Sequence, residues 1–285
     1  RGTSDHAAVY AQYVLGVRHR LTVGLGTPSI VSLYGAAPDV RDALVIGISQ
    51  SGASPDIVAV VDAARTQGAP TIAITNEPGS ALATAADRTI DLGAGPELAV
   101  AATKTYTAEL LALYLLLCGG DADAVPDAAA RTLAFGPQAY AAAERYRFTQ
   151  RLVTTARGFS YPTAREAALK VMETSYLSAQ AFSGADLLHG PLAMVDPDLP
   201  VIAIVTPGAG GAAMAPVVAR LAESGANVLL VGPEGGLPVA SAGIAEELLP
   251  ILEILPLQQL AWRLALDRGG DPDRPRGLSK VTETW

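Results

Sequence analysis

The stretch ALVIGISQSGASPD, residues 43–56, joins a short apolar run to a loop of hydroxyl and amide side chains. Residues 43–48 are apolar and partly β-branched, which is typical of a buried strand. An amphipathic pattern then extends to residue 68, with Ser54 placed as N-cap and Pro55 in the first turn of a helix. The stretch therefore predicts a strand, a polar loop and a helix, which together form the basic unit of an α/β fold.

The loop offers several hydrogen-bonding groups to a ligand. It carries the hydroxyls of Ser49, Ser51 and Ser54 and the amide of Gln50, and Gly52 permits close approach. Backbone N–H groups and the positive end of the helix dipole attract an anion at this edge of a sheet. No Walker lysine follows, which disfavours a nucleoside triphosphate. We interpret the loop as a site for a phosphate monoester, with an ordinary strand-to-helix turn as the alternative.

Two parts of the chain follow one plan. Arg1-Gly2-Thr3-Ser4 recurs as Arg157-Gly158-Phe159-Ser160, and Val45–Ile48 recurs as Val201–Ile204, both at an offset of 156 residues. Agreement in order and offset favours an internal duplication. At the place of the phosphate loop, the second copy reads TPGAGG (residues 206–211) and has lost most hydroxyls. We therefore expect only one copy to bind phosphate.

Short β-branched runs alternate with helical stretches in each copy, which is typical of a parallel sheet with helices on both faces. The expected strands lie at 21–24, 43–48, 71–75, 88–92, 151–156, 200–205 and 227–231. The repeat also predicts a strand before Arg1, because a strand precedes the matching turn in the second copy. We expect one subdomain at 1–145, a second at 146–250, and a C-terminal helix and tail at 251–285.

Composition argues against several partners. The chain has 20 basic and 28 acidic residues, a net charge of −8, and no cluster of basic residues for nucleic acid or an anionic membrane. The longest apolar run, residues 110–118, is too short to cross a bilayer and predicts a core helix. The single cysteine, Cys118, ends this run and is expected to be a reduced core thiol, which favours a cytoplasmic protein.

Lysine is scarce in this chain. Among the 20 basic residues only three are lysines, at positions 104, 170 and 280. Lysine can lose its proton and form a Schiff base, whereas guanidinium stays charged, so each lysine is a candidate for chemistry that arginine cannot do. A helix predicted over residues 162–177 places Glu166, Lys170 and Glu173 on one face. A solvated salt bridge is one interpretation, and a carboxylate base for proton transfer is the other.

Taken together, these motifs resemble the sugar isomerase (SIS) domain family. The resemblance rests on the phosphate loop, the duplicated plan, and three further motifs: EAALKVME at 166–173, HGPL at 189–192 and PRGLSK at 275–280. It covers essentially the whole chain, which is similar to the isomerase half of glucosamine-6-phosphate synthase and to stand-alone SIS-type glucosamine-6-phosphate deaminases. The family implies tandem three-layer αβα subdomains of flavodoxin-like type with parallel sheets.

The resemblance also implies roles for individual residues. Glu173 would be the base that moves a proton between C1 and C2 of the sugar. His189 would help to open the sugar ring, reaching the active site of the neighbouring subunit, so a homodimer is expected. The C-terminal helix and tail at 251–285 would close over the active site, where Lys280 would engage the open-chain carbonyl. Lys170 matches a second active-site lysine.

The other matched positions would bind the sugar phosphate. They lie in the first turn, the phosphate loop and a further substrate loop: Thr3, Ser4, Ser49, Gln50, Ser51, Ser54, Val100 and Ala102. Ala102 stands where the synthase has Ser, so a contact there would be made through the backbone. We expect no cofactor and no metal.

Deamination of glucosamine 6-phosphate to fructose 6-phosphate and ammonia is the favoured reaction. Nothing here resembles the synthase's glutaminase domain, and Cys118 cannot replace its nucleophile. Ala53 and the endings at residues 1–6 and 280–284 look more like the stand-alone members. Glutamine-dependent amination, or isomerisation of another amino-sugar or ketose phosphate, remains an alternative. A non-catalytic sugar-phosphate sensor is a third, although it need not keep Glu173, His189 and Lys280 together.

Overall fold

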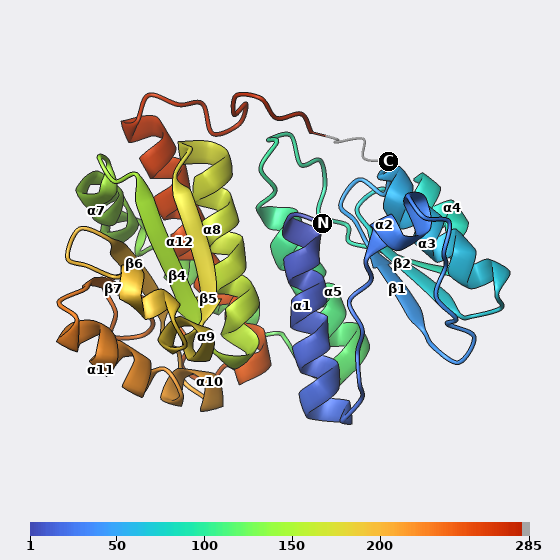
Figure 1. The fold of residues 1–285 in the computed structure, drawn as a ribbon, viewed down its shortest axis with the longest axis horizontal. Helices are drawn as coiled ribbons and strands as arrows, with labels where there is room; N and C mark the ends of the chain where they lie inside the picture. The colour runs from blue at the N-terminus through green and yellow to red at the C-terminus, as the bar shows by residue number, and fades with distance from the viewer. Residues whose placement is uncertain (281–285) are drawn as a thin grey trace. The chain divides into compact units, whose positions relative to one another are not determined.

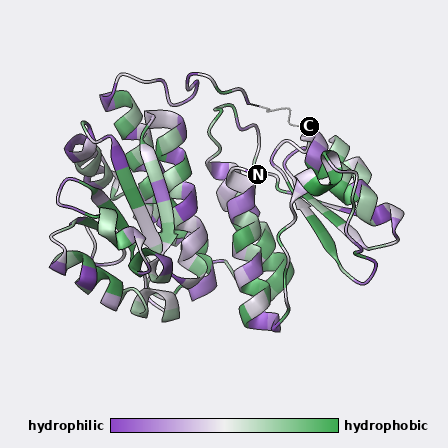
Figure 2. Cartoon of the chain, in the orientation of Figure 1, coloured by the Kyte–Doolittle hydropathy of each residue, from purple (hydrophilic) through white to green (hydrophobic). Residues whose placement is uncertain are grey.

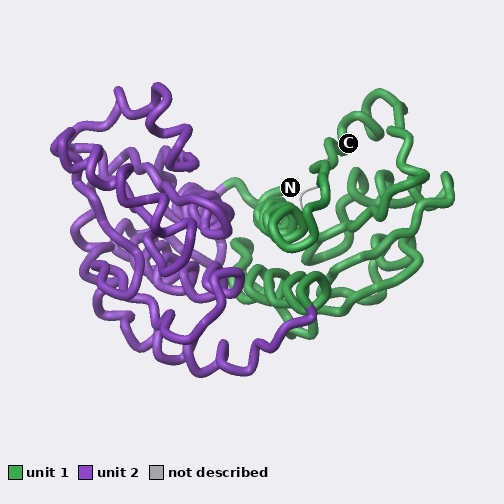
Figure 3. The backbone as a smooth tube through the Cα atoms, turned by 90° about the horizontal axis from the view of Figure 1, so that it is seen from below, with its two compact units in different colours: residues 1–118, 277–285 green, residues 119–276 purple. Residues whose placement is uncertain are grey.

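The computed structural model describes residues 1–280, so the part of the expected tail at 281–285 lies outside the described residues. The described chain forms two compact units, coloured separately in Figure 3. Unit 1 comprises residues 1–118 and the tail from Gly277, and unit 2 comprises residues 119–276. None of the helices described is long and apolar enough to cross a membrane.

Unit 1 is built on a three-stranded parallel sheet of order β1-β2-β3. Its elements are α1 (Thr3–Val14), η1 (Leu15–His19), α2 (Pro28–Ser32), β1 (Val45–Ile48), α3 (Pro55–Thr66), β2 (Thr71–Thr75), α4 (Ala81–Ala85), β3 (Arg88–Asp91) and α5 (Lys104–Cys118). Helices α3 and α4 pack on the sheet through a core that contains Val61, Ala73 and Leu82. Helices α1 and α5 pack together and contact β1 and β2, respectively. Figure 2 shows β1 and β2 in the hydrophobic colour, as a covered sheet requires.

Unit 2 is built on a four-stranded parallel sheet of order β5-β4-β6-β7. Its elements are α6 (Val125–Leu133), α7 (Gly136–Tyr146), β4 (Arg151–Ala156), η2 (Gly158–Ser160), α8 (Tyr161–Ser175), β5 (Ser178–Ser183), α9 (Gly184–Leu188), η3 (Pro191–Met194), β6 (Pro200–Ile204), α10 (Ala209–Ala212), α11 (Ala215–Glu223), β7 (Asn227–Val231), η4 (Glu246–Leu248) and α12 (Leu249–Asp267). Helices α9 and α11 share a core with β4 and β6, while α8 contacts β4 and β5 and packs against α12 (Figure 1).

The predicted fold class is confirmed, since both sheets are parallel and carry helices. The strands expected near 43–48, 71–75, 88–92, 151–156, 200–205 and 227–231 are present as β1, β2, β3, β4, β6 and β7. The predicted helices after Ser54 and over 162–177 are present as α3 and α8. The boundary between the compact units does not coincide with the boundary between the two copies of the repeat. Helices α6 and α7 precede the second copy, yet they pack on α12 and belong to unit 2.

The strand expected at 21–24 is wrong, because these residues adopt no regular structure. Its counterpart at an offset of 156 is β5, which pairs only with β4. The segment 21–24 pairs with none of the strands of the described unit 1 sheet, β1-β2-β3. Conversely, we missed β5 itself. Its sequence SAQAFS is rich in residues of low β propensity and is not uniformly hydrophobic (Figure 2).

The expectation of a core thiol at Cys118 is also wrong. The apolar run does form a helix, α5, but its last turn is not buried: Cys118 has intermediate exposure, and Leu115 and Leu116 are 48% and 40% exposed. The buried face of α5 lies earlier, at Tyr106, Leu110 and Leu113. An unbroken run of apolar residues gives no periodicity from which the buried face could be assigned.

Candidate active site

The predicted phosphate loop follows β1 and leads into α3. Its own hydroxyls accept hydrogen bonds from its backbone, since Gly52 N donates to Ser49 Oγ at 3.2 Å and Ala53 N donates to Ser51 Oγ at 3.3 Å. Ser54 is the N-cap residue and Pro55 begins the helix, but the Ser54 side chain makes no capping bond. The side chains of this loop thus gather at the start of α3, with their hydroxyls beside backbone N–H groups.

Residues from the end of β2 to the first turn of α4 donate hydrogen bonds to the backbone of the loop. Asn76 N donates to Gln50 O at 3.1 Å, and Leu82 N donates to Gly52 O at 3.0 Å. Gly52 has a φ of 59°, and a Cβ at this position would lie 2.1 Å from Ser80 Oγ. Only glycine fits this backbone conformation and this space without displacement. The shape of the loop therefore depends on Gly52 as much as on its hydroxyls.

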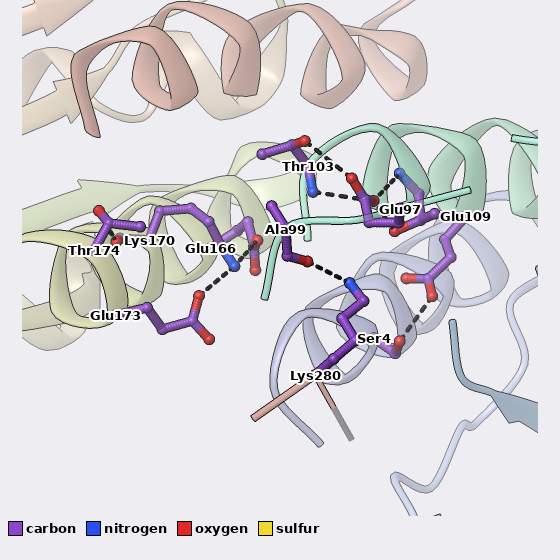
Figure 4. A network of polar contacts seen from close by, with 11 residues as sticks. Ser4, Glu97, Ala99, Thr103, Glu109, Glu166, Lys170, Glu173, Thr174 and Lys280 are labelled. Atoms are coloured by element: carbon purple, nitrogen blue, oxygen red, sulfur yellow. Dashed lines mark hydrogen bonds and ion pairs between the residues drawn. The ribbon is translucent and has the colours of Figure 1, made fainter. Parts of the chain in front are cut away.

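Ser4, expected beside the phosphate, takes part in an internal contact. Its Oγ donates to Glu109 Oε1 at 2.7 Å, as Figure 4 shows, and Glu109 is buried in α5. Thr3 and Ser4 begin α1, so both lie at a helix N-terminus. A carboxylate inside an apolar helix requires such a donor, because burying it without hydrogen bonds is costly. Glu109 thus fixes the Ser4 side chain within unit 1.

The second expected substrate loop, which contains Val100 and Ala102, is held by Glu97. The carboxylate of Glu97 accepts hydrogen bonds from the backbone N–H and hydroxyl of both Thr103 and Thr105, at 2.5 to 3.3 Å. Burial alone would raise the pKa of Glu97, but the bonds from Thr105 and Thr103 outweigh it and lower the pKa. Glu97 thereby caps the start of α5 and shapes the loop before it.

Lys280 reaches this same loop. Its Nζ donates to the carbonyl oxygen of Ala99 at 2.7 Å (Figure 4). Lys104, the first residue of α5, donates to Pro96 O at 2.6 Å instead. Within unit 1 the tail lysine thus contacts the backbone of Ala99, the residue directly before the predicted substrate segment 100–104.

Three charged side chains of α8 form one cluster in unit 2. Lys170 Nζ lies 2.5 Å from Glu173 Oε2 and 3.3 Å from Glu166 Oε1. Glu166 and Lys170 are almost fully buried, with 0% and 2% of their side chains exposed, whereas 22% of the Glu173 side chain is exposed. A solvated salt bridge is therefore ruled out, and Glu173 is the member that a ligand can reach.

Electrostatics keeps the central lysine charged. Burial alone would lower the pKa of Lys170, but the carboxylates of Glu166 and Glu173 outweigh it and raise the pKa. A protonated Lys170 can orient and partly neutralise the Glu173 carboxylate, but it is a poor nucleophile. The cluster therefore suits Lys170 to hold the Glu173 carboxylate in place, and Glu173 is the more exposed of its two carboxylates.

His189 stands apart from that cluster. It directly follows α9, where its backbone N–H donates to Asp186 O at 3.0 Å. The residue is exposed, and no hydrogen bond to its ring is found among residues 1–280. The ring is therefore available to a ligand or to another chain.

The second copy of the loop holds a carboxylate of the protein itself. Glu246 accepts from Ala209 N at 3.0 Å and from Gly210 N at 2.8 Å, one bond to each of its oxygens. A Cβ on Gly208 would lie 2.2 Å from the Glu246 carboxyl carbon, so the approach depends on glycine. In the second copy, the backbone N–H groups at the position of the phosphate loop thus donate to a carboxylate of the protein itself. This supports the expectation of one phosphate site per chain.

A fully buried carboxyl group lies beside this second loop. Glu253 of α12 accepts from Ser160 Oγ at 2.7 Å and from the hydroxyl of Thr206. Burial raises the pKa of Glu253 to about 7, against the lowering effect of these hydrogen bonds. Ser160 matches Ser4 in the repeat, so each copy joins its first turn to a buried glutamate of a long helix, Glu109 in one and Glu253 in the other.

Four of these acidic residues were missed from the sequence: Glu97, Glu109, Glu246 and Glu253. Two of them could have been found from the sequence, because Glu109 and Glu253 are lone acidic residues within apolar runs. A carboxylate buried in such a run requires a hydrogen-bond donor. Glu97 and Glu246 lie in loops, where their partners depend on tertiary structure.

Comparison with known proteins places the chain in a family. The sequence model described as "SIS domain" matches residues 1–118 and 147–242. The chain belongs to the SIS domain family. These two matched segments agree with the duplication inferred from the repeat.

The names of two relatives of this SIS chain refer to sugar phosphates. It is 34% identical over 98% of its length to the glutamine–fructose-6-phosphate aminotransferase (isomerizing) of Pyrococcus horikoshii, and spans about half the length of that relative. A solved structure from Silicibacter pomeroyi, described as a candidate phosphosugar isomerase, has a TM-score of 0.85 and 34% identity, with 96% of this chain and 86% of that one covered.

A third similar protein shows the fold alone. The glucosamine-6-phosphate deaminase of Thermotoga maritima is 24% identical, with a TM-score of 0.85 over 99% of this chain and 88% of its own. The α/β fold with parallel sheets is thus shared with SIS proteins that carry different functional names.

Proposed function

We propose that this chain converts glucosamine 6-phosphate and water to fructose 6-phosphate and ammonia. The observation that carries the proposal is the Glu166–Lys170–Glu173 cluster, in which one carboxylate remains reachable beside a buried, charged lysine. A carboxylate held in this way is suited to move a proton between adjacent carbons. The names of the relatives, all within sugar-phosphate chemistry, point to the same class of substrate.

The steps balance with the groups of this chain. His189 would move a proton as the sugar ring opens, and Lys280 would engage the open-chain carbonyl. Glu173 would then take the proton from C2 and return it to C1, giving an imine at C2. Water adds to this imine, and ammonia leaves. No oxidant or reductant is needed, because the aldose carbon is reduced as C2 is oxidised.

The phosphate would be held by the loop at residues 49–54. Ser51 offers a hydroxyl beside the N-terminus of α3, and a hydrogen bond to a charged group contributes roughly 1.5 to 3 kcal/mol. Ser51→Ala should therefore raise KM by roughly 10-fold to 100-fold and leave kcat nearly unchanged. Ser224→Ala is the matched control, because it alters a half-buried serine whose hydroxyl donates to Arg220 O of the preceding helix, α11.

The decisive experiment follows ammonia and fructose 6-phosphate together, with glucosamine 6-phosphate as substrate and no glutamine present. Equal amounts of the two products are expected from the wild-type chain and only traces from Glu173→Gln. Binding of the sugar phosphate without either product would overturn the deaminase proposal in favour of a sensor. Turnover of other phosphorylated sugars but not of glucosamine 6-phosphate would instead indicate an isomerase with a different substrate.

Amination in the opposite direction is a second candidate, favoured by the 34% identity to an isomerizing aminotransferase. The same proton transfer serves both directions, so the site residues are shared. Incubating fructose 6-phosphate with ammonium chloride tests it directly. Formation of glucosamine 6-phosphate that exceeds deamination at matched concentrations would favour this candidate.

We further propose a cytoplasmic homodimer in which His189 serves the partner's site. The exposed ring of His189, without a hydrogen bond among residues 1–280, supports this arrangement. A mixing experiment tests it: Glu173→Gln and His189→Asn are each expected to be inactive, yet mixed dimers should regain one intact site in two. Mixtures that stay inactive, although subunits exchange, would contradict it.

A further inference from the structure

Tyr176 directly follows α8 in a left-handed backbone conformation, which residues other than glycine rarely adopt. Its φ is 58° and its ψ 32°, and the N–H of the next residue, Leu177, donates to Val171 O at 3.4 Å as the helix closes. Among residues 1–280, only Arg20 and Tyr176 combine a positive φ with a side chain. Glycine would satisfy this backbone without strain. The tyrosine at this position therefore supplies something that the turn alone does not require.

What it supplies is a double contact with Arg276. The backbone N–H of Arg276 donates to the Tyr176 hydroxyl at 2.9 Å, and the Arg276 guanidinium carbon lies 4.1 Å from the centre of the ring. The second contact has cation–π geometry, since a cation within about 6 Å of the ring centre is attracted by it. Residues 100 positions apart are thus joined by two different interactions within unit 2.

Arg276 is the point at which the tail leaves unit 2. The next residue, Gly277, has a φ of 73°, and Lys280 follows three positions later. Four Cα-to-Cα steps span at most about 14 Å. Holding Arg276 in place therefore limits the volume that the Lys280 amino group can reach, whatever path the intervening residues take.

The anchor is carried by the helix that also carries the proposed base. Glu173 precedes Tyr176 by three residues, at the last turn of α8. We propose that Tyr176 is a positioning residue that fixes the start of the C-terminal tail through Arg276 and so delivers Lys280 to the open-chain carbonyl of the substrate. The inference rests on the proposed function, in which Lys280 engages that carbonyl.

The test compares Tyr176→Phe and Tyr176→Gly in two backgrounds, wild type and Lys280→Ala. Loss of one neutral hydrogen bond should lower kcat by about 3-fold to 10-fold in Tyr176→Phe. Loss of the whole anchor should lower kcat by about 10-fold to 100-fold in Tyr176→Gly, because small misplacements of reacting groups are costly. In the Lys280→Ala background neither substitution should lower kcat further.

Two further measurements separate positioning from folding. The Arg276 amide should exchange its hydrogen faster in both Tyr176 variants, since its acceptor is lost. Arg20→Gly is the matched control, because it relieves a similar backbone conformation (φ 56°) in unit 1 without touching Arg276, and its kcat should equal that of wild type.

Equal losses of kcat in both backgrounds would overturn the inference, as would an unchanged kcat in Tyr176→Gly when the Arg276 amide exchanges faster. These outcomes differ from failure of the proposed function, which shows as wild-type protein that forms neither ammonia nor fructose 6-phosphate. That result would overturn both proposals at once.

Discussion

Lys170 Nζ lies 2.5 Å from Glu173 Oε2, and this is the shorter of two ion pairs made by a lysine with only 2% of its side chain exposed. The longer pair joins it to Glu166, which is fully buried. Burial of Glu166 and Lys170 is tolerated because each is held by an opposite charge one helical turn away. The cluster is thus both a condition for folding and the source of the reachable carboxylate.

Removing Lys170 should therefore destabilise the protein strongly. Lys170→Met leaves the buried Glu166 carboxylate without its cation, and breaking such a pair costs about 3 to 5 kcal/mol. Urea unfolding monitored by circular dichroism measures this change. The double variant Lys170→Met, Glu166→Gln should recover most of the loss, because no buried charge then remains unpaired.

An exposed ion pair provides the control for this prediction. Arg220 and Glu223 lie 2.7 Å apart with more than half of each side chain exposed. Arg220→Met should change the free energy of unfolding by only about 0 to 1 kcal/mol. Equal effects of Lys170→Met and Arg220→Met would show that burial of the α8 cluster contributes nothing.

Gly52 should be the least replaceable residue of the phosphate loop. Alanine there meets both a positive φ and Ser80, whereas Gly68→Ala meets a positive φ with no atom within 4 Å. We expect Gly52→Ala to cost more stability than Gly68→Ala, where strain alone applies at about 1 to 2 kcal/mol. Adding Ser80→Gly should relieve part of the difference in thermal unfolding. If the two single variants unfold alike, the close packing of the loop against Ser80 is unimportant.

Stability should fall as the pH rises from about 4.5 to about 7, owing to Glu253. Burial on folding raises its pKa from the ordinary carboxyl value of 4.5 to about 7, so the folded state keeps a proton that the unfolded state has released. The stabilisation is complete below pH 4.5 and is lost as the pH passes through 7. A shift of this size corresponds to about 3 kcal/mol at most.

Glu253→Gln tests this dependence, because glutamine keeps the shape but does not titrate. Its free energy of unfolding relative to wild type should increase by up to about 3 kcal/mol between pH 4.5 and pH 8. Glu223→Gln, at an exposed position, should run parallel to wild type. A Glu253→Gln curve that also runs parallel would contradict the burial argument.

Much of the fold could be predicted from sequence because local pattern and architecture agree. The β-branched runs of β1, β2 and β6 stand next to amphipathic helices, and the offset of 156 fixes which elements correspond. The sequence pattern gave wrong strand predictions where strand formation depends on pairing with a distant strand. Residues 21–24 look like a strand but pair with no strand of the described sheet of unit 1, while β5 forms from residues of low β propensity because it pairs along its whole length with β4.

The candidate site could be predicted in part, for a similar reason. The face shared by Glu166, Lys170 and Glu173 follows from helical spacing, and the structure confirms the contacts. The supports could not be found in this way. The hydrogen bonds from Thr105 to Glu97, from Gly210 to Glu246 and from Arg276 to Tyr176 depend on how loops and chain ends return to distant elements, which periodicity does not encode.

The most direct measurement of the central claim follows the hydrogen at C2 of glucosamine 6-phosphate. With deuterium at C2, wild-type turnover should slow by a primary isotope effect, and part of the deuterium should appear at C1 of fructose 6-phosphate by NMR. Glu173→Gln should lower this transfer by roughly 10²-fold to 10⁴-fold, as expected for loss of a general base. Intact deuterium at C2 after prolonged incubation with wild-type protein, or transfer at the wild-type rate in Glu173→Gln, would contradict the account.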